Sequence, residues 1–280
     1  MHLHFTEILA HIIPEALRML PFLFGAYLFM EYLEHKAPDG LQNLLTRHKG
    51  SGVVIGSLLG CVPQCGFSVA ASNLYAGGVI SAGTLIAIFL STSDEALMVM
   101  LGHPDRWNEI FRLLGCKILL AIFVGLLVDK LLRRSHEHHI HDLCEHCGCH
   151  ESEGILGPAL RHTLQVFVFI LVVMFLLEAG IHALGEERLA SVLLTDSFLQ
   201  PVVAALIGFI PNCAVSVALT ELYLAGNISF GSAVAGLATG AGMGLMVLWR
   251  THRDTGENLK IMAIMFAAGS LCGILLQLVM

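Results

Sequence analysis

The chain has 280 residues, of which 56% are apolar and only 13% are charged, and its formal net charge is −7. Soluble domains carry about 25% charged residues, and the mean hydropathy here is +0.76. So few charges do not cover a water-facing surface, so the composition predicts a multispanning membrane protein. It excludes a cytosolic enzyme, a secreted disulfide scaffold and a nucleic-acid-binding protein.

Apolar stretches long enough to cross a bilayer follow one another along the chain. We expect six ordinary spans, at 12–33, 79–101, 115–132, 159–182, 230–249 and 260–280. The stretches at 51–77 and 199–226 differ, because each carries a proline and polar residues at its middle. Irregular backbone at membrane depth is tolerated only where it is buried in protein or lines a wet cavity. These two stretches are therefore predicted to be half-helix hairpins with a functional tip.

The two interrupted stretches are copies of one another. Residues 60–83 align without a gap on residues 208–231, and twelve of the 24 positions are identical. Hydrophobic bias does not explain why a proline, a cysteine, serines and a tyrosine coincide. Repeats with discontinuous helices are typical of secondary transporters, whose substrate sites lie near the midplane between the repeats. We expect a first repeat at 1–134, a loop at 135–154 and a second repeat at 155–280.

The relative orientation of the repeats depends on whether the Pro-Cys stretches cross the membrane. If they are re-entrant, the two halves are inverted; if they cross fully, the halves run parallel, and the positive-inside rule barely separates these arrangements. We expect inversion, because 27 apolar residues (51–77) with a central proline make a natural hairpin of two short arms. The predicted fold is an all-α polytopic membrane protein with two inverted repeats, each with a broken or re-entrant Pro-x-Cys helical hairpin.

The hairpin tips place matched polar groups near the axis that relates the repeats. Each tip offers a thiol, an amide oxygen and, one helical turn later, a hydroxyl. The arm after each proline begins with free backbone N–H groups and a positive dipole end, which suits an anion or a thiolate. The alternative is a cysteine that only fills space and a proline that only kinks the helix. The predicted substrate-binding residues of the tips are Gln64, Cys65, Ser68, Asn212, Cys213 and Ser216.

A second set of candidates lies in the middle of the span expected at 79–101. Asp94 and Glu95 are adjacent acids in an apolar stretch, and ionisable residues inside a membrane are functional by default. The matching stretch 239–244 is polar and glycine-rich but uncharged. We read the acids as cation ligands or proton carriers; the alternative is that they reach the interface, where acids cost little. This set comprises Ser91, Ser93, Asp94, Glu95 and Thr239, and the predicted metal ligands of the membrane site are Cys65, Cys213, Asp94 and Glu95.

The loop between the repeats is rich in histidine and cysteine, which are ligands for soft and borderline metals. Nine of its residues 136–150 are of these two types, and Cys144-x-x-Cys147 has the spacing of a ligand pair. The pattern predicts metal binding without identifying the metal. We expect a sensor, buffer or delivery tract rather than the transport site, on the cytoplasmic side; an accidental polar linker is the alternative. Its predicted ligands are His136, His138, His139, His141, Cys144, His146, Cys147, Cys149 and His150.

The duplicated Gly-x-x-Pro-x-Cys motif, followed by Ser-Val-Ala and Leu-Tyr and flanking a His-rich loop, resembles the family of heavy-metal exporters. Members of that family are labelled arsenic efflux proteins or manganese transporters. The resemblance covers nearly the whole chain, and the paired Pro-Gln-Cys and Pro-Asn-Cys tips are its most specific part. It implies a multi-pass transporter of about ten segments in the bacterial inner (plasma) membrane that exports a metal or metalloid.

We therefore expect a secondary transporter rather than an enzyme, exporting a divalent cation such as manganese or zinc, or arsenite. No ATP-binding motif is present, so protons or ions carried by Asp94 or Glu95 would supply the coupling. The expected partners are the lipid bilayer and a small ion, with no nucleic acid, and a homodimer is left open. No cofactor is required, and zinc or manganese is expected as substrate and loop ligand. The alternative is a transporter of phosphate, arsenate or an organic anion bound at the facing half-helix N-termini.

Overall fold

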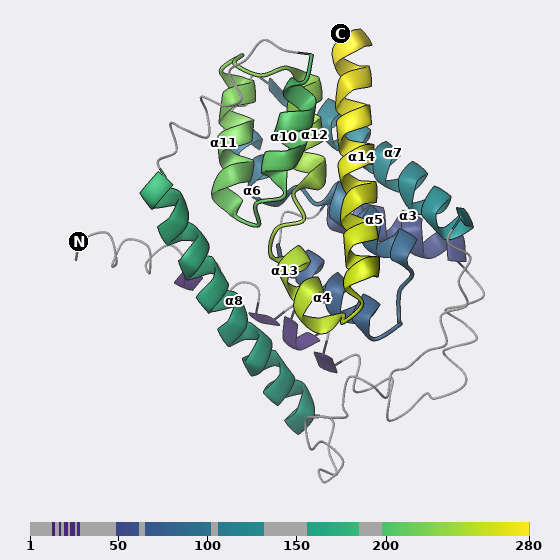
Figure 1. The fold of residues 1–280 in the computed structure, drawn as a ribbon, viewed down its shortest axis with the longest axis vertical. Helices are drawn as coiled ribbons and strands as arrows, with labels where there is room; N and C mark the ends of the chain where they lie inside the picture. The colour runs from purple at the N-terminus through teal and green to yellow at the C-terminus, as the bar shows by residue number, and fades with distance from the viewer. Residues whose placement is uncertain are drawn as a thin grey trace.

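The computed structural model describes residues 49–61, 65–101, 106–131, 156–184 and 198–279, with single positions between 13 and 28. The regular structure in this part of the chain is helical, without strands, which confirms the predicted all-α class (Figure 1). The helices are α3 (Lys49–Gly60), α4 (Cys65–Ala76), α5 (Ala82–Ser91), α6 (Asp94–Leu101), α7 (Trp107–Leu131), α8 (Leu156–Leu184), α10 (Gln200–Gly208), α11 (Cys213–Leu224), α12 (Phe230–Thr239), α13 (Met243–Thr251) and α14 (Thr255–Val279).

The helices recur at a fixed spacing along the chain. Helices α11, α12 and α14 begin and end 148 residues after α4, α5 and α7. Helices α10 and α13 match α3 and α6 with ends that differ by no more than three residues. The corresponding helices α7 and α14 run in opposite senses along the long axis of the molecule (Figure 1), as an inverted repeat requires. The sequence repeat is therefore also a repeat of structure.

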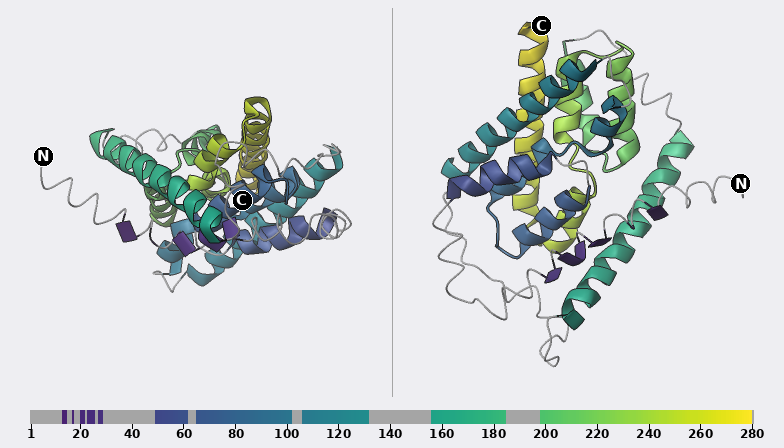
Figure 2. Two further views of the ribbon diagram at one scale, coloured as in Figure 1. Left: turned by 90° about the horizontal axis from the view of Figure 1, so that it is seen from below. Right: turned by 180° about the vertical axis from the view of Figure 1, so that it is seen from behind.

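The helices within each repeat pack in the same arrangement, and each repeat also packs some of its helices on helices of the other repeat. Helix α5 lies between α3 and α7, and α12 lies in the same way between α10 and α14. Across the repeats, α4 packs on α13 and α11 packs on α6 (Figure 2). The arms α3 and α4 pack on other helices more than on each other, as do α10 and α11. The stretches are thus interrupted as predicted, and whether they turn back or cross the membrane stays a prediction.

The turns that follow α4 and α11 are formed by matching residues of the two repeats. Gly78 and Gly226 have φ angles of 70° and 78°, a left-handed conformation that glycine adopts without steric cost. Each ends its helix with the pair of backbone hydrogen bonds that defines a Schellman motif. The next helix is then capped by Ser81 or Ser229, whose Oγ accepts the backbone N–H three residues on at 3.1 Å. These local requirements explain why glycine and serine recur in register.

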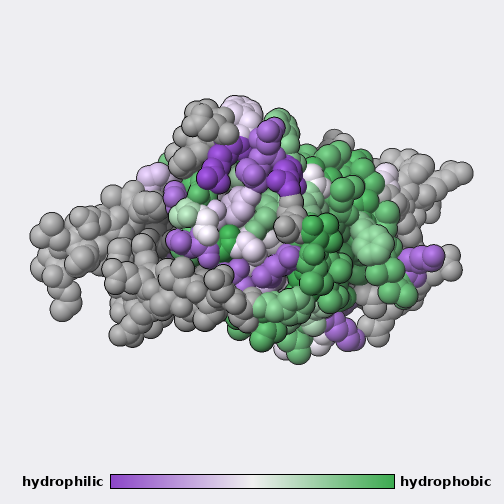
Figure 3. Space-filling view, turned by 90° about the horizontal axis from the view of Figure 1, so that it is seen from above, coloured by the Kyte–Doolittle hydropathy of each residue, from purple (hydrophilic) through white to green (hydrophobic). Residues whose placement is uncertain are grey.

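The outer surface is that of a protein surrounded by lipid. Among the described residues, three segments are long and apolar enough to cross a membrane: Trp107–Leu131, Phe230–Thr251 and Thr255–Val279. In the most apolar 18 residues of each segment, 83% are buried in Phe230–Thr251, against 33% and 28% in the other two. Large apolar side chains such as Leu119 and Phe123 are therefore exposed on α7. Figure 3 shows hydrophilic residues gathered at one end, beside a broad apolar area.

Candidate functional site

Two helices are interrupted at the centre of the molecule. In the first repeat α5 stops at Ser91, and α6 starts at Asp94. In the second repeat α12 stops at Thr239, and α13 starts at Met243, with Gly242 at a φ of 53° in the gap. Each stretch was expected as one ordinary span, and the interruptions fall at the polar residues in their middles. Unwound backbone of this kind leaves carbonyl and N–H groups available to a ligand.

A single buried lysine connects the two interruptions. Lys117 on α7 is completely buried. Its Nζ donates hydrogen bonds to the carbonyl oxygen of Thr92, which caps α5, and to that of Leu237 in the last turn of α12, the latter at 2.8 Å. The C-terminal ends of helices carry partial negative charge, so the ammonium of Lys117 compensates the charge at the ends of both α5 and α12. Charge compensation of this kind is what a buried ammonium requires.

The sequence prediction missed Lys117 for a geometrical reason. The span was expected to begin at residue 115, which would put Lys117 at the membrane surface. Helix α7 instead begins at Trp107, ten residues before Lys117. The signal that could have found it is the general one, an ionisable residue within an apolar stretch.

The predicted hydroxyl ligands of this region are all buried beside the interruptions. Ser91 Oγ donates to the carbonyl oxygen of Ile88 at 3.0 Å, and Ser93 Oγ donates to that of Ser91 at 3.1 Å. Thr239 Oγ1 lies 2.7 Å from the carbonyl oxygen of Ala205 on α10. The hydroxyl protons are therefore used by backbone, and the oxygen lone pairs are what these residues could offer a cation. Their role in binding stays a prediction.

The predicted thiols and acids stand at the first turns of half-helices. Cys65 and Cys213 are the first residues of α4 and α11, and Asp94 and Glu95 open α6. The side chains of these four residues, and Gln64, lie outside the described part of the structure. Asn212 is half-buried just before α11, and its carbonyl oxygen accepts the N–H of Val215 at 3.2 Å. The backbone thus places the candidates at half-helix N-termini.

The two predicted serines on α4 and α11 differ in their surroundings. Ser68 is fully buried where α4 crosses α13, and a Cβ atom on Gly244 would lie 2.7 Å from its Cβ. One turn on, Ser72 Oγ lies 2.6 Å from the carbonyl oxygen of Gly244. Ser216 is half-buried on α11. Ser68 therefore belongs to a contact between the repeats.

No group of three or more potential metal ligands occurs among the described side chains. The predicted loop ligands and the four predicted metal ligands of the membrane site fall outside those side chains. The loop ligands are His136, His138, His139, His141, Cys144, His146, Cys147, Cys149 and His150.

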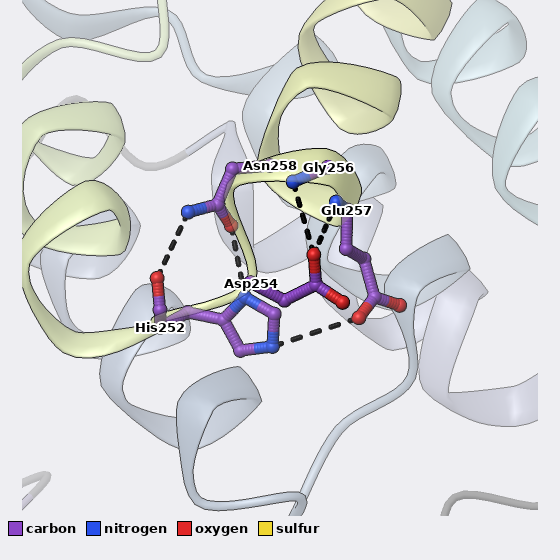
Figure 4. A network of polar contacts seen from close by, with 5 residues as sticks. All are labelled: His252, Asp254, Gly256, Glu257 and Asn258. Carbon is purple, nitrogen blue, oxygen red and sulfur yellow. Dashed lines mark hydrogen bonds and ion pairs between the residues drawn. The ribbon is translucent and has the colours of Figure 1, made fainter.

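A polar network fixes the turn between α13 and α14 (Figure 4). His252 Nδ1 lies 2.9 Å from Asn258 Oδ1, and Asn258 Nδ2 donates to the carbonyl oxygen of His252 at 2.9 Å. Asp254 Oδ1 accepts the N–H groups of Glu257 and Gly256, and these hydrogen bonds, that of Glu257 first, hold the pKa of Asp254 below its ordinary value of 3.8. The His252 ring also packs on Tyr75 of α4, with 5.2 Å between centroids. The turn thus joins the end of α13 to the other repeat.

Interrupted helices, a duplicated inverted architecture and a lipid-facing surface are typical of membrane transporters. The chain matches the family described as "Putative, 10TM heavy-metal exporter" over residues 22–162 and 152–280, and it belongs to that family. This confirms the resemblance found in the sequence. No curated protein and no solved structure matches the chain.

Proposed function

We propose that the protein is a secondary exporter of a heavy-metal or metalloid ion, driven by protons or ions and binding its substrate between the two repeats. The observation that carries the proposal is the fully buried Lys117, which binds the ends of both interrupted helices. In transporters with discontinuous helices, half-helix ends and unwound carbonyl groups coordinate the coupling ion near the midplane. We propose that the ammonium of Lys117 takes the equivalent role here.

The charges at this place suggest how coupling would work. Asp94 and Glu95 lie two and three residues after Thr92 along the chain, and Lys117 binds the carbonyl oxygen of Thr92. In the absence of substrate the ammonium would balance the acids. A metal cation that binds the carboxylates would compete with it, so a proton or ion would have to leave as the substrate enters. The sequence of this chain contains no ATP-binding motif, which favours coupling by such an exchange.

The chemistry of the candidates favours two substrate classes. Carboxylate oxygens suit manganese, and carboxylates together with thiolates suit zinc. Arsenite binds thiols, and Cys65 and Cys213 occupy matching positions in the repeats. We propose that the His/Cys loop at 136–150 delivers or senses the metal on the cytoplasmic side of a bacterial plasma membrane.

Transport into proteoliposomes tests the proposal. Uptake of Mn²⁺, Zn²⁺ and arsenite would be measured for the wild type and for Asp94→Asn and Cys65→Ser. We expect at least one of the three fluxes to fall more than tenfold in each variant. Glu221→Gln and Cys61→Ser are matched controls, because Glu221 is exposed on α11 and Cys61 precedes the tip. If both site variants transported every substrate like the wild type, the site would be wrong.

An anion transporter is the second candidate, and the half-helices favour it. Helices α4, α6, α11 and α13 all begin at interruptions, and N-termini bind anions. Lys117 adds a positive charge, although the hydrogen bonds described above go from its ammonium to carbonyl groups at helix C-terminal ends. Uptake of phosphate or arsenate that is insensitive to metal chelators would favour this function over the first.

A further inference from the structure

Two cysteines from different repeats meet inside the helical bundle. Cys116 on α7 and Cys272 on α14 have their Sγ atoms 3.9 Å apart. Both are free thiols and half-buried. Cys116 lies nine residues after the start of α7 and Cys272 lies seven residues before the end of α14, so both are well inside their helices. The pair thus bridges the last helix of one repeat and the last helix of the other.

The sulfur atoms are at the distance of a thiol–thiol hydrogen bond, and the same separation fits two thiolates on one metal ion. Two thiolates bound to zinc at about 2.3 Å with tetrahedral geometry lie about 3.8 Å apart. A disulfide would need the sulfur atoms to approach to about 2.05 Å. The surroundings are apolar, because both cysteines pack against the buried hydrophobic cluster that includes Leu113 and Leu237. The site thus offers two sulfur donors in an apolar environment, which favours soft ions.

We propose that Cys116 and Cys272 form a two-thiolate site for a thiophilic metal or metalloid ion, distinct from the transport site at Cys65 and Cys213. The pair does not obey the repeat: the positions 148 residues away are Ile264 and Val124. It therefore occurs once per chain, unlike the duplicated tips. An ion bound there joins α7 to α14, so it ties the two repeats together. The proposal does not depend on which substrate is exported.

Phenylarsine oxide is a suitable probe, because its trivalent arsenic binds two neighbouring thiols. The two thiol protons leave with the arsenical oxygen as water, two arsenic–sulfur bonds form, and no oxidant is needed. The test protein is the full chain with the other six cysteines changed to serine, which removes the tips and the loop as competitors. The six cysteines changed to serine are Cys61, Cys65, Cys144, Cys147, Cys149 and Cys213.

We expect one arsenical per chain by intact mass, retained in excess monothiol. Adding Cys116→Ser or Cys272→Ser should abolish the retained adduct, because a single thiol exchanges with the monothiol. If the two-cysteine protein retains no adduct, the proposal is overturned. If that protein does not fold, the native chain replaces it: the double variant Cys116→Ser/Cys272→Ser should then bind one equivalent less than the native chain, and equal binding would overturn the proposal. Because the tips are absent or unchanged in these comparisons, failure here leaves the proposed transport function untouched.

Discussion

Gly83 on α5 and Gly125 on α7 bring their backbones so close that a Cβ atom on either would lie within 3 Å of the other's carbonyl oxygen. The second repeat has the same contact between Gly231 and Gly273, each 148 residues later. Close approach of backbones through small residues is a common way to join helices in a membrane, where the hydrophobic effect does not drive association. The matched pairs explain the tight packing of α7 on α5 and of α14 on α12.

We predict that Gly83→Ala and Gly231→Ala each destabilise the protein. The added methyl group would collide with a backbone carbonyl, and overpacking of this kind costs about 1–3 kcal/mol. Thermal unfolding in detergent should show a lower midpoint for both variants. Gly115→Ala is the control, since nothing lies within 4 Å of a Cβ atom there and alanine favours a helix. Equal midpoints for Gly83→Ala and Gly115→Ala would contradict the predicted collision.

We predict that Lys117→Met lowers transport more than tenfold in a protein that still folds. The substitution keeps most of the side-chain volume and removes the donor for the carbonyl groups of Thr92 and Leu237. Each carbonyl left without a partner costs about 1–3 kcal/mol, so the unfolding midpoint should also fall. Flux into proteoliposomes and thermal unfolding measure the two effects. Lys130→Met, an exposed site on the same helix, should change neither; wild-type flux in Lys117→Met would refute a coupling role.

Asp254 should stabilise the start of α14 in a pH-dependent way. Its pKa in the folded protein lies below the ordinary value of 3.8, because the N–H groups of Glu257 and Gly256 donate to its carboxylate. The contribution is therefore present above pH 3.8 and is lost as the pH falls through the lower, folded value. Hydrogen exchange of the amides at 255–258 should be faster in Asp254→Ala than in the wild type at pH 6, and the difference should shrink near pH 3. The exposed Arg253→Ala is the control, and a difference that stayed constant with pH would exclude this cause.

Deletion of residues 136–150 should separate the two predicted classes of metal site. A thermal-shift panel of Mn²⁺, Zn²⁺, arsenite and phosphate would be run with and without the loop. We expect zinc binding to weaken on deletion, because the loop holds six histidines and three cysteines. Stabilisation that survives the deletion would identify the ligand of the membrane site. An unchanged zinc response would show that the loop is an ordinary linker.

The repeat and its interruptions could be predicted because they depend on local chemistry. A proline, a left-handed glycine at Gly78 and a capping serine at Ser81 act within a few residues of their own positions. The contacts of Lys117 with Leu237 and of Cys116 with Cys272 could not be predicted from the sequence, because these partners lie 120 and 156 residues apart. Neither pair has a counterpart in the other repeat, so the alignment of the two halves did not indicate either contact. The exchanged packing of α4 on α13 had no local signature either.

That exchanged packing also affects how the protein is made. The main packing partners of α4 and α6 are α13 and α11, which belong to the second repeat. At about 5–20 residues per second, the ribosome needs on the order of ten to thirty seconds after completing α6 to synthesise α13. During that interval the half-helices of the first repeat are in the membrane without their final neighbours. Before the second repeat is synthesised, a membrane chaperone or a quality-control protease would thus have an unpaired half-helix of the first repeat to recognise.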